Sequence, residues 1–238
     1  MSPDGVSIVI VSYNEENYLP RLIPNLRARL KELPDDIDTE VLLSDGGSTD
    51  RTVEIARASP LIDTIVSEQD SGVIGGRDKG IRNAEYDLQV HGDADTVYRP
   101  GWLTGLLQPF STDDDTVLTY GSVSGEGLET GTRELYAGLL STMGGHYCPG
   151  QNRALYRPAY KKSPYRDVPQ DVALVTSLEE EVHFANRMEE HGSVTAIPSA
   201  SCKTSGRQTE DILGVAQKVG GVDWKFDPSQ STATHSPN

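Results

Sequence analysis

The chain has 238 residues, of which 36% are hydrophobic, and it carries 36 acidic against 21 basic side chains, for a net charge of -15. This length can form one large domain with a sizeable core, and no apolar run approaches the roughly 20 residues of a membrane-spanning helix. The negative charge argues against nucleic-acid binding through a basic face and against unaided attraction to anionic lipid.

The cysteines and the N-terminal sequence indicate a cytoplasmic protein. Two cysteines, Cys148 and Cys202, are too few for a disulfide framework or a zinc site, so we expect reduced thiols. The first apolar run, residues 6–11, follows Asp4 rather than basic residues, which favours a buried strand over a signal peptide. Contact with the inner face of a membrane is then at most peripheral. We interpret the excess of Asp and Glu as adaptation to a high-salt (halophilic) cell, because molar salt screens self-repulsion.

Strands and helices alternate in the first half of the chain. Apolar runs predict strands over residues 6–12, 40–43, 62–66 and 87–90. Apolar residues at helical spacing predict helices over 16–33, over 48–58 with Ser48 or Asp50 as the N-cap, and over 73–83. This alternation is typical of an α/β fold with a doubly wound, mostly parallel sheet flanked by helices, which binds ligands at the carboxyl ends of its strands.

The second half is less regular. We expect helices from Pro100, over 132–142 and over 178–191, the last ended by Gly192, and strands over 116–121 and 194–198. The stretch 144–169, rich in Gly and Pro, is predicted to be mostly loop around residues 153–156. The tail 227–238 is predicted to be disordered. We therefore expect one domain over residues 1–226, without an interdomain linker.

Two carboxylates separated by one residue follow the predicted strand 87–90. They are Asp93 and Asp95, with Ala94 between them. A strand that ends in Asp-x-Asp directs two oxygen ligands at one small region, and a hard divalent cation that carries a diphosphate needs such donors. A pair of this kind is more often a solvated turn, so its position in a strand–helix series is what favours a cation site.

Five segments of the chain occur together in a characteristic order. They are Val9 to Glu16 (VIVSYNEE), Ser44 to Asp50 (SDGGSTD), Gly75 to Gly80 (GGRDKG), Asp93 to Asp95 (DAD) and Glu179 to Arg187 (EEEVHFANR). As a set they resemble the family 2 glycosyltransferases of the GT-A fold, over residues 6 to about 208. The resemblance implies a nucleotide-sugar-binding half over about 6–98, merged with an acceptor-binding half over about 99–226.

The resemblance also implies roles for the donor site. It places the nucleotide sugar and the cation near residues of the first four motifs and near one arginine after the fifth. These residues are Val11, Tyr13, Glu15, Asp45, Arg77, Asp93, Ala94, Asp95 and Arg207. From the residues alone, Tyr13 either stacks on a base or packs, Asp45 either contacts ligand or forms a turn, and Arg77 is either near the ligand or solvated. Gly46 stands where the family usually has a second acid that often reads the base, which leaves the base open.

The resemblance assigns the cation to the Asp-x-Asp pair. Asp95 is expected to bind Mg²⁺ or Mn²⁺ directly, and Asp93 to hold the ribose or the sugar and a water of the second shell. The cation would neutralise the charge that develops on the leaving diphosphate.

An inverting sugar transfer also needs a carboxylate that takes the proton of the attacking hydroxyl. In the family this acid follows another acid and stands six residues before an Arg. Counting back from Arg187 gives Glu181 as the base, preceded by Glu180; either Glu180 or Glu179 would contact the acceptor. Acids in a first helical turn also suit the helix dipole, which is the competing interpretation. Arg207 would clamp the diphosphate; Gln208 stands where many relatives have a second Arg.

The favoured function is therefore an inverting, metal-dependent glycosyltransferase. Its donor would be a UDP- or GDP-sugar, and its acceptor a glycan or a polyprenyl phosphate. Two alternatives remain open: a nucleotide-sugar-binding module without catalysis, and a sugar-phosphate nucleotidyltransferase. The latter normally has a Gly-rich phosphate loop after the first strand, where this chain has Tyr13, Asn14, Glu15 and Glu16.

Overall fold

The structure is a computed structural model that describes residues 5–67, 72–125, 146, 148–164 and 177–205. The chain divides into two compact units, Met1–Gly206 and Arg207–Asn238, and all described residues belong to the first. The expected helix over 132–142 and the expected tail over 227–238 lie outside the described residues.

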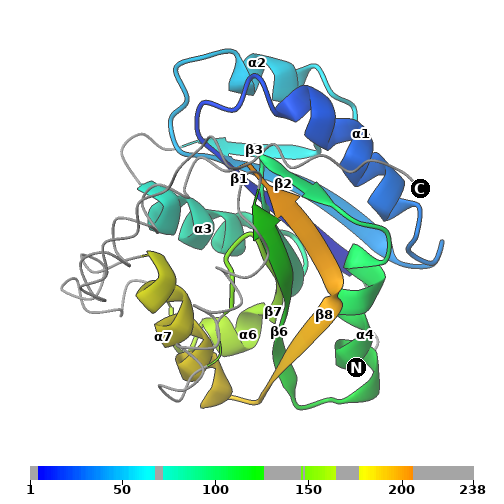
Figure 1. Ribbon diagram of the computed structural model, residues 1–238, viewed down its shortest axis with the longest axis vertical. Helices are drawn as coiled ribbons and strands as arrows, with labels where there is room; N and C mark the ends of the chain where they lie inside the picture. Colours follow the sequence, from blue (N-terminus) through cyan, green and yellow to red (C-terminus); the bar gives the residue numbers. More distant parts are fainter. Residues whose placement is uncertain (1–4, 68–71, 126–145, 147, 165–176, 206–238) are drawn as a thin grey trace, which may run out of the picture. The chain divides into compact units, whose positions relative to one another are not determined.

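The described part is built around an eight-stranded sheet with the strand order β3-β2-β1-β4-β7-β6-β8-β5 (Figure 1). Strands β3, β2, β1 and β4 pair in parallel, β7 is antiparallel to both β4 and β6, and β8 runs parallel to β6 and antiparallel to β5. The strands are β1 (Gly5–Ser12), β2 (Asp38–Asp45), β3 (Thr64–Ser67), β4 (Leu88–Asp93), β5 (Thr96–Tyr98), β6 (Thr116–Gly125), β7 (Asn152–Tyr156) and β8 (Ser193–Thr204). The predicted α/β class is confirmed, with an antiparallel section beside its parallel half.

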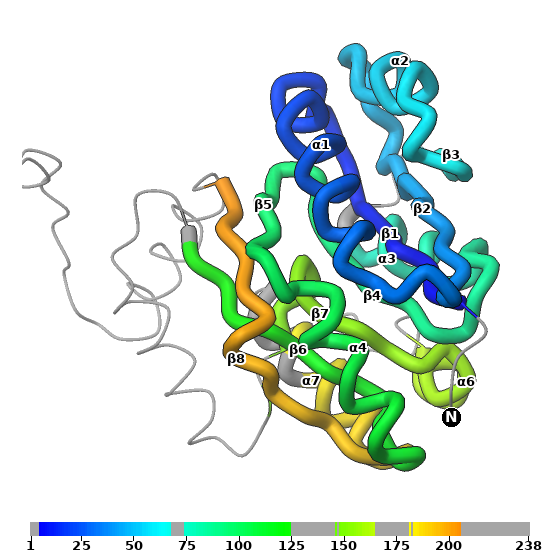
Figure 2. The backbone as a smooth tube through the Cα atoms, turned by 90° about the vertical axis from the view of Figure 1, so that its right-hand side faces the viewer, coloured from blue at the N-terminus to red at the C-terminus, as the bar shows by residue number. Residues whose placement is uncertain are grey.

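Helices cover both faces of this sheet. In Figure 2, α1 and α4 lie in front of the strands and α7 lies behind them. One face packs against α1 (Leu19–Leu30), α2 (Thr52–Arg57) and α4 (Trp102–Thr112); the other packs against α3 (Gly72–Asn83), α6 (Arg157–Tyr160) and α7 (Ser177–Glu189). The two-residue period of the strands sorts the side chains between the faces. Ile8 and Ile10 of β1 belong to the core under α1, whereas Val9 lies on the α3 face.

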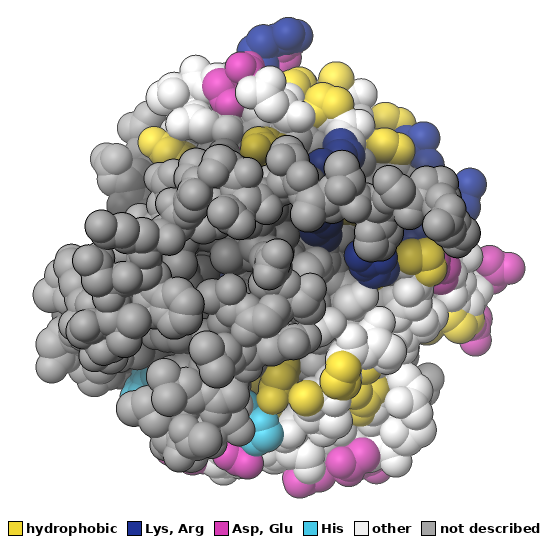
Figure 3. Space-filling model, viewed as in Figure 1, with side chains coloured by type: hydrophobic (Ala, Val, Ile, Leu, Met, Phe, Trp, Pro, Cys, Tyr) yellow, Lys and Arg dark blue, Asp and Glu magenta, His cyan; other side chains and the backbone are white. Residues whose placement is uncertain are grey.

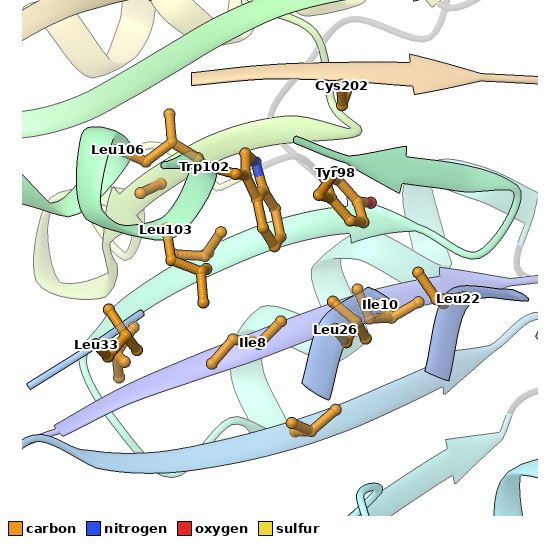
Figure 4. Packing of buried hydrophobic residues seen from close by; sticks show 14 of the residues in the cluster. Ile8, Ile10, Leu22, Leu26, Leu33, Tyr98, Trp102, Leu103, Leu106 and Cys202 are labelled. Carbon is orange, nitrogen blue, oxygen red and sulfur yellow. The ribbon is translucent and has the colours of Figure 1, made fainter. Parts of the chain in front are cut away.

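The core under α1 and α4 is centred on two stacked aromatic rings. The rings of Tyr98 and Trp102 lie 3.7 Å apart with an interplanar angle of 20°, and both side chains are fully buried (Figure 4). The indole Nε1 of Trp102 donates to Asn152 Oδ1 at 2.8 Å, so the polar atom of this large side chain is satisfied. This stack joins the end of β5 to the start of α4 within the core.

The structure corrects several predicted elements. Residues 152–160 are not loop: they form β7, a central strand, and the short helix α6. Strand β5 was not predicted, and β8 does not end at Pro198, because the pairing with β6 shifts register near that proline and resumes at Cys202. Helix α2 starts at Thr52 with Arg51 as its N-cap, which makes no side-chain cap bond.

No helix in the described part of the chain has both the length and the apolar character needed to cross a bilayer. On the face shown in Figure 3, the described acidic side chains lie at several separate places near the top, the right and the bottom. The described acidic side chains therefore do not gather in one patch on that face.

Candidate active site

The candidate site lies where the parallel strands β1, β2 and β4 end. In the sheet register Ser12 is the partner of Asp45 and Val11 is the partner of Asp93. The amide of Ala94 donates to the carbonyl oxygen of Val11 at 2.9 Å, which continues the β1–β4 pairing past the end of β4. Three of the sequence motifs thus meet at one edge of the sheet, as expected for the carboxyl ends of parallel strands.

Asp45 organises the turn after β2. Its carboxylate is only 1% exposed and accepts hydrogen bonds from the backbone amides of Gly47 and Ser48, at 3.0 and 2.9 Å. It also accepts from the hydroxyls of Ser12, Ser48 and Ser67, which belong to or follow three different strand ends. A carboxylate has about four lone-pair positions, so these donors occupy its hydrogen-bonding capacity. Asp45 therefore fixes the ends of β1, β2 and β3 relative to one another.

The loop after β1 is joined to the loop after β2 by side-chain hydrogen bonds. Asn14, which adopts a left-handed conformation with φ 56°, receives a bond from Thr49 N at 2.9 Å and donates its own amide to Ser48 Oγ at 2.8 Å. The amide of Glu15 donates to Thr52 Oγ1 at 2.6 Å. These bonds delay the start of α1 to Leu19, three residues after the predicted start. They also leave Tyr13 59% exposed, with its ring beside Gly46.

Asp93 is held by a buried arginine. Nη2 of Arg77, on α3, lies 3.4 Å from both carboxylate oxygens of Asp93, and the Arg77 side chain is only 4% exposed. Burial raises the pKa of Asp93, the positive charge of Arg77 opposes that rise, and the nearby Asp95 adds to it. The two carboxylates therefore repel each other in a poorly solvated place, and a cation bound between them would relieve this repulsion.

Asp95 is tied to the end of β8. Its Oδ1 accepts from the hydroxyls of Thr96 and Thr204, each at 3.2 Å, and its Oδ2 accepts from the hydroxyl of Ser205. The backbone amide of Ser205 also donates to the carbonyl oxygen of Asp95 at 3.2 Å. These contacts orient the carboxylate from a segment more than a hundred residues away in the sequence.

The backbone of the Asp-x-Asp segment has a support that sequence reasoning missed. The phenol of Tyr98 donates to the carbonyl oxygen of Asp93 at 3.1 Å, and burial raises the pKa of Tyr98 well above its usual range, so this donor stays protonated. A Cβ at Gly92 would come within 2.8 Å of Tyr98 Cζ and closer still to its oxygen, so the strand must have glycine there.

Glu181 is buried at the start of α7. It is 5% exposed, and its Oε1 accepts from the backbone amide of Gly150 at 2.8 Å. The neighbouring buried side chains are polar as well: the Arg153 guanidinium lies over the Phe184 ring at 4.2 Å, and burial raises the pKa of the Cys148 thiol to about 12. The charge of Glu181 adds to this rise in the pKa of Cys148, so the predicted base lies near a thiol that stays protonated.

His91 lies on the same face of β4 as Asp93 and is fully buried between the charges of Arg77 and Arg153. Burial, reinforced by these two positive charges, lowers its pKa well below the usual value, so the imidazole is neutral. Its Nε2 lies 3.2 Å from Gln89 Oε1, which fits the tautomer protonated on Nε2.

The predicted site residues separate into two groups. Val11, Tyr13, Asp45, Arg77, Asp93 and Asp95 come together at the ends of β1, β2 and β4, with Ala94 buried in the Asp-x-Asp segment and Glu15 in the adjoining loop. Glu181 is linked to this group through Gly150, because its carboxylate accepts from the Gly150 amide and the Arg77 guanidinium lies beside this glycine. Glu180 precedes Glu181 in α7, and its side chain, like Glu179 and Arg207, lies outside the described residues.

Among the described side chains, no group of three or more His, Cys, Asp or Glu is placed to hold a metal ion. The oxygen donors of Asp93 and Asp95 nevertheless suit Mg²⁺ or Mn²⁺, which proteins commonly hold with one or two carboxylates while substrate phosphates complete the coordination. The donor set therefore fits a cation that arrives with a diphosphate.

Structural comparison identifies the fold. A mannosyltransferase from Pyrobaculum calidifontis, in complex with GDP-Man and Mn²⁺, is 18% identical with a TM-score of 0.67, covering 96% of this chain and 67% of that one. Glucosyl-3-phosphoglycerate synthase from Mycobacterium tuberculosis, in complex with Mn²⁺, UDP-glucose and phosphoglyceric acid, is 17% identical with a TM-score of 0.67, covering 91% and 77%. At these identities the likeness establishes the GT-A fold.

Sequence comparison gives relatives of the same kind. N-acetylgalactosaminyltransferase 6 from Drosophila melanogaster is 26% identical over 119 residues, which are 48% of this chain and 18% of that protein. An uncharacterized glycosyltransferase from Nostoc sp. is 26% identical over 113 residues, covering 46% and 34%. The matches thus span about a third or less of these curated relatives. The family model for glycosyl transferase family 2 matches residues 7–169, which include the site's first four motifs. The chain belongs to glycosyl transferase family 2.

Proposed function

We propose that this protein is an inverting, metal-dependent glycosyltransferase that moves a sugar from a nucleotide-sugar donor to an acceptor hydroxyl or a lipid-linked phosphate. The observation that carries this proposal is the Asp93–Asp95 pair, which lies at the end of β4 with Arg77 at its side and with Asp95 oriented by Thr204 and Ser205. Two fold relatives with bound Mn²⁺ and a nucleotide sugar support it.

The donor site would use the exposed ring of Tyr13 and the rim formed by the Asp-x-Asp segment. Tyr13 offers a flat face on which a nucleotide base can stack. Asp45 supports this arrangement by fixing the loop, because its carboxylate already accepts bonds from the turn and from three strand ends. Asp93 and Asp95 would hold Mg²⁺ or Mn²⁺, which supplies the positive charge that the diphosphate needs as it leaves.

The chemistry is a single displacement at the anomeric carbon. The acceptor oxygen forms a bond to this carbon while the bond from the carbon to the diphosphate oxygen breaks, so the nucleoside diphosphate leaves with the bonding electrons. Glu181 accepts the proton of an acceptor hydroxyl as the new bond forms. Arg77 stays beside Asp93, where its positive charge opposes the rise in the pKa of this carboxyl that burial causes.

The cation role is tested by Asp95→Asn, with Asp87→Asn, just before β4, as the control. We expect Asp95→Asn to abolish Mn²⁺-dependent binding of the nucleoside diphosphate and both donor hydrolysis and transfer. Asp87 pairs with Arg157, away from the strand's carboxyl end, so its variant should behave like the wild type. Full activity of Asp95→Asn would remove the proposed cation site.

The base is tested by Glu181→Gln, with Glu189→Gln at the other end of α7 as the control. The glutamine keeps an oxygen that can accept from Gly150 N, so the local fold is preserved while the ability to take a proton is lost. Transfer should fall by about 100-fold or more, the usual scale of general-base catalysis, with donor binding unchanged. Normal turnover by Glu181→Gln would assign the base elsewhere.

We further propose a glycan or a polyprenyl phosphate as the acceptor and either UDP or GDP as the donor's nucleotide. A panel of UDP- and GDP-sugars assayed against both acceptor classes, in solution and on vesicles, decides between them. The proposed high-salt adaptation is tested in parallel: the melting temperature should rise with KCl up to molar concentrations. A protein that is equally stable without added salt would contradict that adaptation.

A further inference from the structure

The segment 148–152, which leads into β7, passes between the predicted base and the arginine of the cation site. Gly150 is buried in it, and its backbone amide donates to Glu181 Oε1 at 2.8 Å. A turn bond from Asn152 N to Pro149 O, at 3.0 Å, holds the backbone on both sides of this glycine. The amide therefore presents a fixed donor to the Glu181 carboxylate.

The Arg77 guanidinium occupies the space where a side chain at residue 150 would stand. A Cβ built on Gly150 would lie 2.6 Å from Nε of Arg77 and closer still to Cζ and Nη2. The same Nη2 lies 3.4 Å from both carboxylate oxygens of Asp93. Only a glycine at position 150 leaves Arg77 in the place from which it reaches Asp93.

The requirement for glycine here is one of space and not of backbone conformation. The glycines with positive φ in the described part of the chain are Gly47, Gly101 and Gly192, so alanine can adopt the backbone of residue 150 without strain. Arg77 is 3% exposed, so an added methyl group would displace the guanidinium inside the protein rather than into solvent.

We propose that Gly150 is a positioning residue for sugar transfer, because its amide orients Glu181 and its missing side chain lets Arg77 hold Asp93. This inference rests on the proposed function, which assigns Asp93 to the donor site and Glu181 to the acceptor side. One residue would then set the positions of carboxylates in both halves of the site. A change at Gly150 would then affect cation binding through Arg77 and Asp93.

The test is a double-mutant cycle between Gly150→Ala and Arg77→Leu, read by calorimetric titration of UDP or GDP in the presence of Mn²⁺. We expect Gly150→Ala to weaken this binding by about tenfold and Arg77→Leu by at least as much. The double variant should bind no more weakly than Arg77→Leu alone, because leucine lacks the guanidinium that the new methyl group displaces. Gly76→Ala is the matched control: its Cβ would lie 3.4 Å from Val11 Cγ1, an ordinary contact, so its binding should match the wild type.

Two results would overturn the inference. One is wild-type binding and transfer by Gly150→Ala; the other is a double variant in which the two losses multiply, since Gly150 would then act independently of Arg77. Should Gly150→Ala fail to fold, recovery of folding in the double variant, measured by circular dichroism, supports the same steric link. A double variant that also fails to fold contradicts it.

Failure of the proposed function gives a different pattern. If Glu181→Gln transfers sugar normally, the base assignment fails while the binding cycle can still show coupling between Gly150 and Arg77. If Asp93→Asn keeps Mn²⁺-dependent nucleotide binding, the donor assignment fails whatever the cycle shows.

Discussion

Replacing Tyr98 with phenylalanine removes one buried oxygen atom that supports the candidate cation site. The Tyr98 hydroxyl donates to the carbonyl oxygen of Asp93 at 3.1 Å, and the ring stays stacked on Trp102 whether or not the hydroxyl is present. Phenylalanine therefore keeps the aromatic packing of the core and deletes only the hydrogen bond to the Asp-x-Asp segment.

The cost follows from the burial of Tyr98 and the partial burial of this hydrogen bond. Leaving a partly buried carbonyl oxygen without this donor costs about 1–3 kcal/mol. In a chain of this size each kcal/mol lowers the melting temperature by about 2–4 °C. If poorer positioning of Asp93 reduces the free energy of binding by about 1 kcal/mol, Mn²⁺ with a nucleoside diphosphate binds roughly fivefold more weakly.

The assay pairs thermal unfolding of the metal-free protein with calorimetric titration of UDP or GDP and Mn²⁺. The matched control is Tyr120→Phe. Tyr120 lies on β6, away from the Asp-x-Asp segment, and its hydroxyl is 3.0 Å from Nδ1 of His146. Both variants should lose stability, but only Tyr98→Phe should lose cation-dependent binding. Equal binding by the two variants would refute the view that Tyr98 positions Asp93.

Three further substitutions test the electrostatics and packing of the sheet. Burial raises the pKa of Asp93 above that of an unfolded Asp, so the folded state loses stability as the pH rises through the pKa of the folded protein. Asp93→Asn should therefore raise the melting temperature of the metal-free protein at pH 7. A lower melting temperature would contradict the raised pKa. Because the pKa of His91 is lowered, the free energy of unfolding falls as the pH drops below about 6.5. Denaturant titrations should show that His91→Asn reduces the slope of this free energy against pH by up to about 1.4 kcal/mol per pH unit. An unchanged slope would argue against a buried neutral imidazole. A Cβ at Gly121 would lie 2.5 Å from Asn152 Nδ2 and closer still to the carbonyl oxygen of Ala200. Gly121→Ala should therefore lower the free energy of unfolding by about 1–3 kcal/mol in a denaturant titration. Gly46→Ala is the control and should lower it less, because a Cβ there would have no atom nearer than 3.5 Å.

The first half of the fold could be predicted because its information is local. Strands β1, β2, β3 and β4 overlap the predicted apolar runs, although β2 and β4 are longer than predicted, and helices with apolar residues at helical spacing separate them. The meeting of Val11, Asp45 and Asp93 at one edge also follows, since parallel strands bring their carboxyl ends to the same side.

The second half depends on contacts that leave no periodic signal. Strand β7 carries the polar residues Asn152 and Arg153 in a central position, because Trp102 satisfies the first and Phe184 covers the second. The bonds from Thr204 and Ser205 to Asp95 join segments about 110 residues apart, and nothing in the sequence pairs these two hydroxyls with Asp95. The roles of Glu181 and of the donor-site residues stay predictions.

The most direct test of the account is the electron paramagnetic resonance spectrum of Mn²⁺ in the presence of the protein and UDP or GDP. For the wild type, we predict a bound Mn²⁺ signal that requires the nucleoside diphosphate. In Asp95→Asn the ion should remain free, while Asp87→Asn should bind it like the wild type. An unchanged bound signal in Asp95→Asn would contradict the claim that the carboxylates at the end of β4 hold the cation of the donor.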